Sequence, residues 1–66
     1  MQIRVNNQSV SLAEKSNMSD LIDQLTLSGS RIAVELNREI VPRSDYDARA
    51  LHDGDVIEIV QAIGGG

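Results

Sequence analysis

One stretch of the 66-residue sequence, HDGDVIEIV at residues 52–60, decides the fold. Its first four residues are a tight-turn signal, and we expect Gly54 to adopt a positive φ because glycine has no Cβ to oppose that conformation. The alternation that follows places Ile57 and Ile59 on one side of the backbone, which is typical of a half-buried β-strand. The stretch therefore predicts a strand with one face in the core and the other face open.

Strand periodicity recurs in four other segments, at residues 2–6, 8–12, 31–36 and 40–41. The first two flank an Asn6-Asn7 turn signal and predict a β-hairpin. Pro42 lacks an N–H donor, so we expect strand pairing to end there or at a sheet edge. The polar segment 43–51 predicts a loop or a single helical turn.

The period changes to that of a helix after Asn17. Asn17 is a good N-cap, and Asp20 lies where its carboxylate completes a capping box. We expect the helix to stop near Gly29, since glycine favours a helix C-terminus. The apolar stripe that should face the core consists of Met18, Leu21, Ile22 and Leu25.

A hairpin followed by one helix and further strands predicts a two-layer α+β fold. We expect a single domain over residues 1–61, followed by a flexible Gly-rich tail at residues 62–66. The side chains expected to point inward are Ile3, Val5, Val10, Leu12, Leu21, Ile22, Leu25, Val34, Leu36, Ile57 and Ile59.

The composition excludes several functions. A net charge of −4, a sequence pI near 4.6 and a single aromatic residue, Tyr46, argue against nucleic-acid binding. The sequence has no cysteine and one histidine, and Asp53 and Asp55 lack the closing Glu of a calcium loop, so we expect no bound metal or cofactor. No apolar run reaches 18 residues and no leader is recognisable, so we expect a cytoplasmic protein without a membrane segment.

The sequence ends in Gly64-Gly65-Gly66. Without Cβ atoms, such a segment can enter a channel that is too narrow for side chains, and its only chemical group is the terminal carboxylate. We therefore interpret the tail as a carboxylate presented to another enzyme, with Gly66 as the reacting residue and Gly64 and Gly65 as the part that enters the partner's active site. A frayed terminus is the alternative.

Four motifs resemble the ThiS family of sulfur carrier proteins of thiamin (thiazole) biosynthesis, and they occur in the family's order. They are residues 33–37 (AVELN), 40–43 (IVPR), 51–60 (LHDGDVIEIV) and the terminal Gly65-Gly66. The resemblance covers the whole chain; the one departure is Gly64, which adds a third glycine. It implies a ubiquitin-like β-grasp fold, with a mixed sheet of four to five strands, one helix across one face, and the first and last strands side by side.

The resemblance also implies a mechanism in which the protein is a carrier and not an enzyme. A ThiF-like adenylyltransferase, using ATP and magnesium, would adenylate the Gly66 carboxylate. Sulfur from a cysteine desulfurase relay would then displace AMP and leave a thiocarboxylate. A ThiG-like thiazole synthase would take that sulfur.

Docking of partners should require a surface on the domain as well as the tail, because ordering glycines costs conformational entropy. The outward positions of the last strand, Val56, Glu58 and Val60, are the candidate docking residues; partial cover by neighbouring strands is the alternative. Arg43 is expected to be a solvated surface residue in preference to an ion-pair donor to a partner, and Tyr46 is expected to cover the edge of the core.

Three other functions remain open at this stage. A MoaD-like sulfur carrier for molybdopterin synthesis shares the Gly-Gly end, but that family is usually longer and richer in aromatic residues. A ubiquitin-like modifier would be conjugated to lysines through Gly66. A protein-binding domain with an inert tail is the third.

Overall fold

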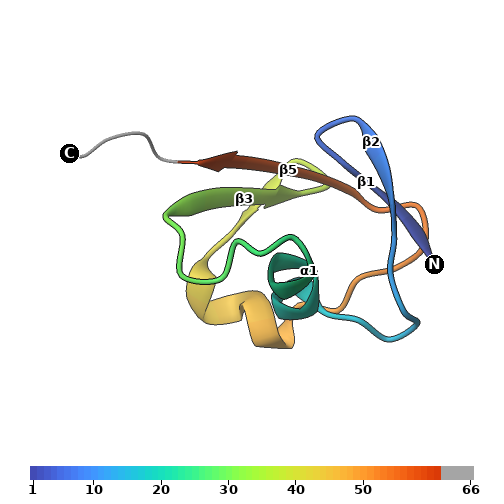
Figure 1. The fold of residues 1–66 in the computed structure, drawn as a ribbon, viewed down its shortest axis with the longest axis horizontal. Coiled ribbons are helices and arrows are strands. Elements are labelled where there is room, and N and C mark those ends of the chain that lie inside the picture. The colour runs from blue at the N-terminus through green and yellow to red at the C-terminus, as the bar shows by residue number, and fades with distance from the viewer. Residues whose placement is uncertain (62–66) are drawn as a thin grey trace.

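A five-stranded sheet and one α-helix form two layers in the computed structural model, which describes residues 1–61 (Figure 1). The sheet has the order β2-β1-β5-β3-β4, and only β1 and β5 pair in parallel. The first and last strands thus lie side by side in a mixed sheet, as the resemblance implies. The strands are β1 (Gln2–Val5), β2 (Gln8–Ser11), β3 (Ile32–Leu36), β4 (Glu39–Val41) and β5 (Val56–Gln61).

Both antiparallel hairpins close through two-residue turns with positive φ at both positions. Asn6 and Asn7 have φ values of 49° and 69°, and Asn37 and Arg38 have values of 50° and 71°. Positive φ at both central residues marks a type I′ turn, whose twist matches that of the flanking strands. Asparagine tolerates this conformation better than most residues, so each turn begins with a suitable residue.

The helix α1 (Met18–Gln24) begins as predicted and ends earlier than predicted. The Asn17 side chain accepts the Asp20 N–H at 2.8 Å, and the Asp20 carboxylate accepts the Asn17 N–H at 2.9 Å, which confirms the capping box. The expected stop near Gly29 is wrong, because Thr26 takes the left-handed conformation at φ 59°. The Thr26 and Leu27 N–H groups bond to the carbonyls of Asp23 and Ile22, which is a Schellman motif without glycine.

The core lies between α1 and one face of the sheet. The segment predicted as a loop or a single helical turn forms the 3₁₀ helix η1 (Arg43–Ala48), whose six residues make about two turns. Tyr46 on η1 is 8% exposed, as expected for a residue at the edge of the core. Of the predicted inward residues, Val10 and Leu25 are half-buried and the other nine are buried. Met18, which was expected on the core-facing stripe of the helix, is also buried, whereas the burial of Val41 and Leu51 was not predicted.

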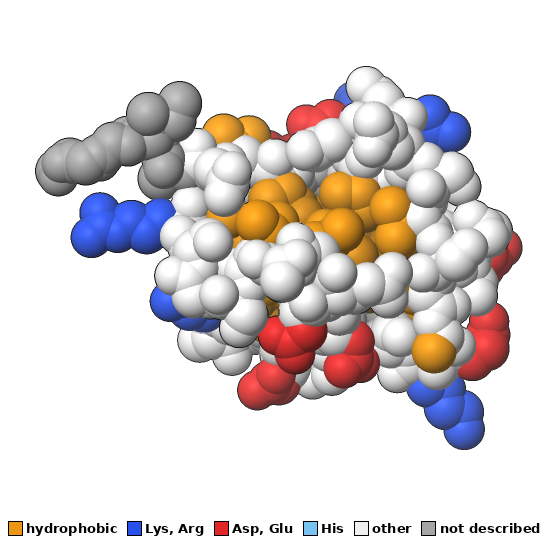
Figure 2. Space-filling view, viewed as in Figure 1, with side chains coloured by type: hydrophobic (Ala, Val, Ile, Leu, Met, Phe, Trp, Pro, Cys, Tyr) orange, Lys and Arg blue, Asp and Glu red, His pale blue; other side chains and the backbone are white. Residues whose placement is uncertain are grey.

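Val10 and Leu25 are incompletely covered by the rest of the domain. They line a groove of about 310 Å³ between the sheet and the helix, together with Leu27 and Ile59. Figure 2 shows the apolar side chains gathered in this gap, framed by polar surface. No helix within residues 1–61 has the length and apolar character needed to cross a membrane.

Candidate functional site

The candidate site is the face of β5 that points away from the helix. On the inner face Ile57 and Ile59 are buried, with exposures of 0% and 8%. On the outer face Val56 and Val60 are 45% and 65% exposed, and Glu58 is exposed as well. The three predicted docking residues therefore do share an open face, and neighbouring strands leave much of each side chain accessible.

Two asparagine side chains from the hairpin turns fasten β5 in the middle of the sheet. Asn6 accepts the Ile59 N–H at 2.8 Å and donates to the Ile59 carbonyl at 3.0 Å. At the other end of the strand, Asn37 accepts the Val56 N–H at 2.9 Å and donates to the Asp55 carboxylate at 3.1 Å. The backbones of β1 and β5 pair at only two positions, which end at Ile57. The Asn6 side chain continues the hydrogen bonding along β5 as far as Ile59.

The neighbouring strands add side chains to this face that the sequence alone did not indicate. In the register of β3 and β5, Glu35 is the partner of Glu58 and Ala33 is the partner of Val60. In the register of β3 and β4, Ile40 is the partner of Glu35 and is 75% exposed. We call this surface the outer-face patch, defined as Glu35, Ile40, Val56, Glu58 and Val60.

The signal for Glu35 was present in the sequence, since Glu35 alternates with the inward Val34 and Leu36. Its position opposite Glu58 was not readable, because it depends on which strands pair and in which register. Ile40 was missed for a different reason. A two-residue apolar segment, Ile40-Val41, is too short to show which of its two side chains faces inward.

The tail residues Gly64, Gly65 and Gly66 lie outside the described residues. The structure describes the point where the chain enters that segment, at Gln61, the last residue of β5. A groove of about 380 Å³ lies on the domain near this end of the strand and is lined by Arg31, Ile32, Ala33, Arg43 and Val60. Two of the six basic residues of the protein, Arg31 and Arg43, thus line a groove near the end of β5.

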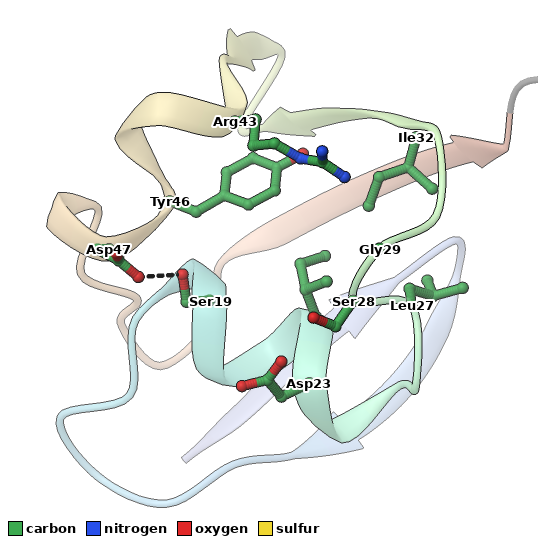
Figure 3. Close-up of a pocket in the computed structure, with 10 residues that line it drawn as sticks. Ser19, Asp23, Leu27, Ser28, Gly29, Ile32, Arg43, Tyr46 and Asp47 are labelled. Carbon is green, nitrogen blue, oxygen red and sulfur yellow. Dashed lines mark hydrogen bonds between the residues drawn. The ribbon is translucent and has the colours of Figure 1, made fainter.

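Arg43 also borders a second hollow, of about 480 Å³, between α1, the α1–β3 connection and η1 (Figure 3). Its guanidinium group is exposed and donates to the Ser30 carbonyl at 2.9 Å. Figure 3 shows Tyr46 beside Arg43, and the Ser19 hydroxyl donating to the Asp47 carboxylate. The lining thus pairs one hydroxyl with one carboxylate, and none of its residues is a histidine, cysteine or lysine that could serve as a stronger base or nucleophile.

Other chemistry is equally sparse on the described domain. Among residues 1–61, no group of three His, Cys, Asp or Glu residues is placed to hold a metal ion. His52 lies on the turn before β5, with its Nδ1 atom 4.0 Å from the Asp55 carboxylate and its side chain open to solvent. Gly54 in the same turn has φ 88°, as predicted. The outer face of β5 therefore remains the candidate site among the described residues.

Comparison with known proteins gives a consistent result. The family model described as "ThiS family" matches residues 3–66. The sulfur carrier protein ThiS of Escherichia coli strain K12 is 35% identical over 66 residues, which cover the whole of both chains. A thiazole synthase of Paramagnetospirillum magneticum is 38% identical over the same 66 residues, which make up 20% of its length.

Among solved structures, the crystal structure of the thiamine biosynthesis protein (ThiS) from Geobacter metallireducens superposes with a TM-score of 0.84. It is 33% identical, and the match covers the whole of both chains. This agreement confirms the α+β, β-grasp arrangement that the resemblance implies.

Proposed function

The chain belongs to the ThiS family, and we propose that it is a sulfur carrier of thiamin biosynthesis that carries sulfur on the carboxyl group of Gly66. The observation that carries the proposal is the extent of the match: the family model extends to Gly66, and the carrier of Escherichia coli aligns along its whole length. The relatives reported above are named for thiamin or thiazole formation and not for molybdopterin, which favours this reading over a MoaD-like carrier.

Activation has to precede sulfur transfer, because an ionised carboxylate is a poor electrophile. A ThiF-like adenylyltransferase would join the Gly66 carboxylate to the α-phosphate of ATP, with magnesium on the nucleotide and pyrophosphate as the leaving group. A sulfur nucleophile would then attack the acyl carbon and expel AMP. In the cell, a cysteine desulfurase relay would supply this sulfur as a persulfide, whose terminal sulfur would attack the acyl carbon and form an acyl disulfide. A thiol would then cleave the S–S bond, which leaves the thiocarboxylate on Gly66 and a disulfide between the thiol and the relay protein.

The role of the described domain in this scheme is recognition. All atoms that change bonding belong to Gly66, ATP and the sulfur donor, so the carrier needs no catalytic side chain. A tail of residues 62–66 can span at most about 17 Å beyond Gln61, at roughly 3.3–3.6 Å for each residue. That reach allows the terminus to enter a partner's active site while the outer-face patch docks outside it.

A ThiG-like thiazole synthase is the proposed acceptor of the sulfur. Support comes from the thiazole synthase of Paramagnetospirillum magneticum, which contains a segment similar to this whole chain within a much longer protein. A carrier segment that is joined to a synthase in one polypeptide meets the active site of that synthase at a high effective concentration. The separate chain would perform the same transfer by binding to its synthase.

The test is intact-mass spectrometry of the protein after incubation with the ThiF-family adenylyltransferase of the same organism, Mg-ATP and sulfide. Sulfide is chosen because its attack on the acyl-adenylate yields the thiocarboxylate and AMP directly. The expected product is heavier by the difference between one sulfur and one oxygen atom, and omission of ATP should prevent the change. An unchanged mass with an adenylyltransferase of demonstrated activity would refute the proposal.

Transfer to the final acceptor separates the two carrier functions. The thiocarboxylate form should lose its sulfur to the ThiG-like thiazole synthase and should keep it in the presence of a large molybdopterin synthase subunit. The opposite pattern would reassign the protein to molybdopterin synthesis.

A further inference from the structure

The outer-face patch places two glutamates opposite each other on neighbouring strands. Glu35 and Glu58 are direct cross-strand partners on the exposed face of the sheet. Side chains opposite each other in an antiparallel pair have Cβ atoms about 4.5–5.5 Å apart, and like charges at that separation are destabilising. None of the ion pairs formed within residues 1–61 involves either glutamate.

Apolar side chains lie near both members of this carboxylate pair, and the exposed Arg4 of β1 is the register partner of Val56 on the same face. The large hydrophobic residues that are exposed within residues 1–61 are Ile40, Val56 and Val60, and all three belong to the outer face. Val56 and Val60 precede and follow Glu58 on the same face of β5, and Ile40 is the cross-strand neighbour of Glu35. Exposed apolar side chains gathered on one face are typical of an interaction surface, and carboxylates among them need a compensating charge if a partner buries them.

From this arrangement, and on the premise of the proposed function, we propose that the adenylyltransferase docks on the outer-face patch by inserting an arginine or lysine side chain between Glu35 and Glu58. A cation placed there would contact both carboxylates and relieve their repulsion. The aliphatic part of the same side chain would lie against Val56, Val60 or Ile40.

A second copy of this chain is a poorer occupant of the patch. Two such faces brought together would set four carboxylates against one another, and each copy already carries a net charge of −4. An apolar partner surface without a cation would leave two carboxylates desolvated and unpaired, which is costly. A cationic partner surface is the occupant that the charges of the patch favour.

The test uses the isosteric neutral variants Glu35→Gln and Glu58→Gln, with Glu39→Gln as the matched control. Glu39 is an exposed glutamate on β4 of the same sheet, and as the cross-strand partner of the buried Leu36 it belongs to the opposite face. All three changes remove one negative charge and retain the size of the side chain. A difference between the patch variants and the control therefore reports the position of the lost charge and not the change in net charge.

The first measurement is thermal unfolding of each free protein. Removal of either member of the pair should raise the melting temperature by about 2–5 °C, because a like-charge contact disappears, and the control should shift it by less. This measurement needs no partner and therefore does not depend on the proposed function.

The second measurement is ATP–pyrophosphate exchange by the ThiF-family adenylyltransferase of the same organism, over a range of carrier concentrations and at low and moderate salt. The expected result for Glu35→Gln and Glu58→Gln is a KM raised about 5–20-fold with kcat unchanged, and a weaker dependence of KM on salt. The control should keep the wild-type KM at each salt concentration.

Two results would overturn the proposal: an unchanged KM in both patch variants while the wild-type protein is activated, or no gain in melting temperature in either. Absence of exchange with the wild-type protein would instead refute the proposed function. Analytical ultracentrifugation at the concentrations used for exchange adds a third check, because dimerisation through this face would identify a second copy as the occupant and overturn the cationic partner.

Discussion

Replacement of Asn6 by glycine should destabilise the domain through the loss of two hydrogen bonds to β5. The Asn6 side chain accepts the Ile59 N–H at 2.8 Å and donates to the Ile59 carbonyl at 3.0 Å. Glycine keeps the left-handed conformation at φ 49° without steric cost, so the backbone of the turn is preserved. Asn6→Gly therefore tests the two hydrogen bonds alone. Asn6→Ala would remove the same bonds and would in addition strain the turn.

The size of the destabilisation follows from the number of hydrogen bonds that are lost. Each intramolecular hydrogen bond contributes about 0.5–1.5 kcal/mol net, so the loss of two should lower the free energy of unfolding by about 2 kcal/mol. For a domain of this size, that corresponds to a fall of about 8–16 °C in melting temperature. Total stabilities of such domains are of the order of 3–10 kcal/mol, so the effect should be easily measured.

Two further variants separate the contributions. Asn6→Asp keeps an acceptor for the Ile59 N–H but sets a carboxylate against the Ile59 carbonyl, so its melting temperature should lie between those of Asn6→Gly and the wild type. Asn7→Gly is the matched control. Asn7 has φ 69° in the same turn, and glycine is the preferred residue there, so stability should change by less than about 0.5 kcal/mol.

Thermal unfolding by circular dichroism, with urea unfolding as a second estimate, measures the three changes. Amide hydrogen exchange followed by NMR adds site resolution, because the Ile59 amide should lose protection in Asn6→Gly and keep it in Asn7→Gly. Equal stability of Asn6→Gly and Asn7→Gly would show that the asparagine side chain does not fasten β5, and the reasoning would fail.

Four further predictions concern the carrier function. One residue appended after Gly66 should abolish ATP–pyrophosphate exchange while the melting curve is unchanged, because adenylation requires a free carboxylate at that position; normal exchange would exclude Gly66 as the reacting residue. Gly66→Val should lower exchange at least about 10-fold, because a β-branched side chain meets a channel that admits bare backbone; a wild-type rate would refute the steric role of glycine. Val60→Asp should weaken binding to the adenylyltransferase by about 1–3 kcal/mol in calorimetric titration. A peptide of residues 62–66 should bind far more weakly than the whole protein, and equal binding of peptide and protein would place recognition in the tail alone.

Local sequence signals predicted the parts of this fold that depend on neighbouring residues. The capping box of Asn17 and Asp20 and the positive φ of Gly54 follow from side-chain chemistry within four residues. The end of the helix did not follow, because Thr26 takes a conformation that favours glycine. Burial of Leu27, which packs against the core just after this residue, is the tertiary contact that can offset that preference.

Long-range pairing accounts for what the sequence could not predict about the site. Alternation along β5 separated the inner Ile57 and Ile59 from the outer valines, and the structure confirms that separation. Which strand would lie beside each outer residue depends on register, and only the structure brings Glu35 opposite Glu58. A period of two assigns a face to each residue, but it does not assign a partner.

The position of the outer-face patch on β5 limits the shape of any partner that uses both the patch and the tail. From Glu58 to Gln61 the strand advances three residues, or about 10 Å at 3.3 Å for each residue. The five residues that follow can add at most about 17 Å. An enzyme that contacts Glu58 must therefore hold its reaction centre within about 27 Å of that contact. The same bound applies to the adenylyltransferase and to the thiazole synthase, because both would act on Gly66. If both also dock on this face, they must bind in turn, and a large excess of one should inhibit the reaction of the other.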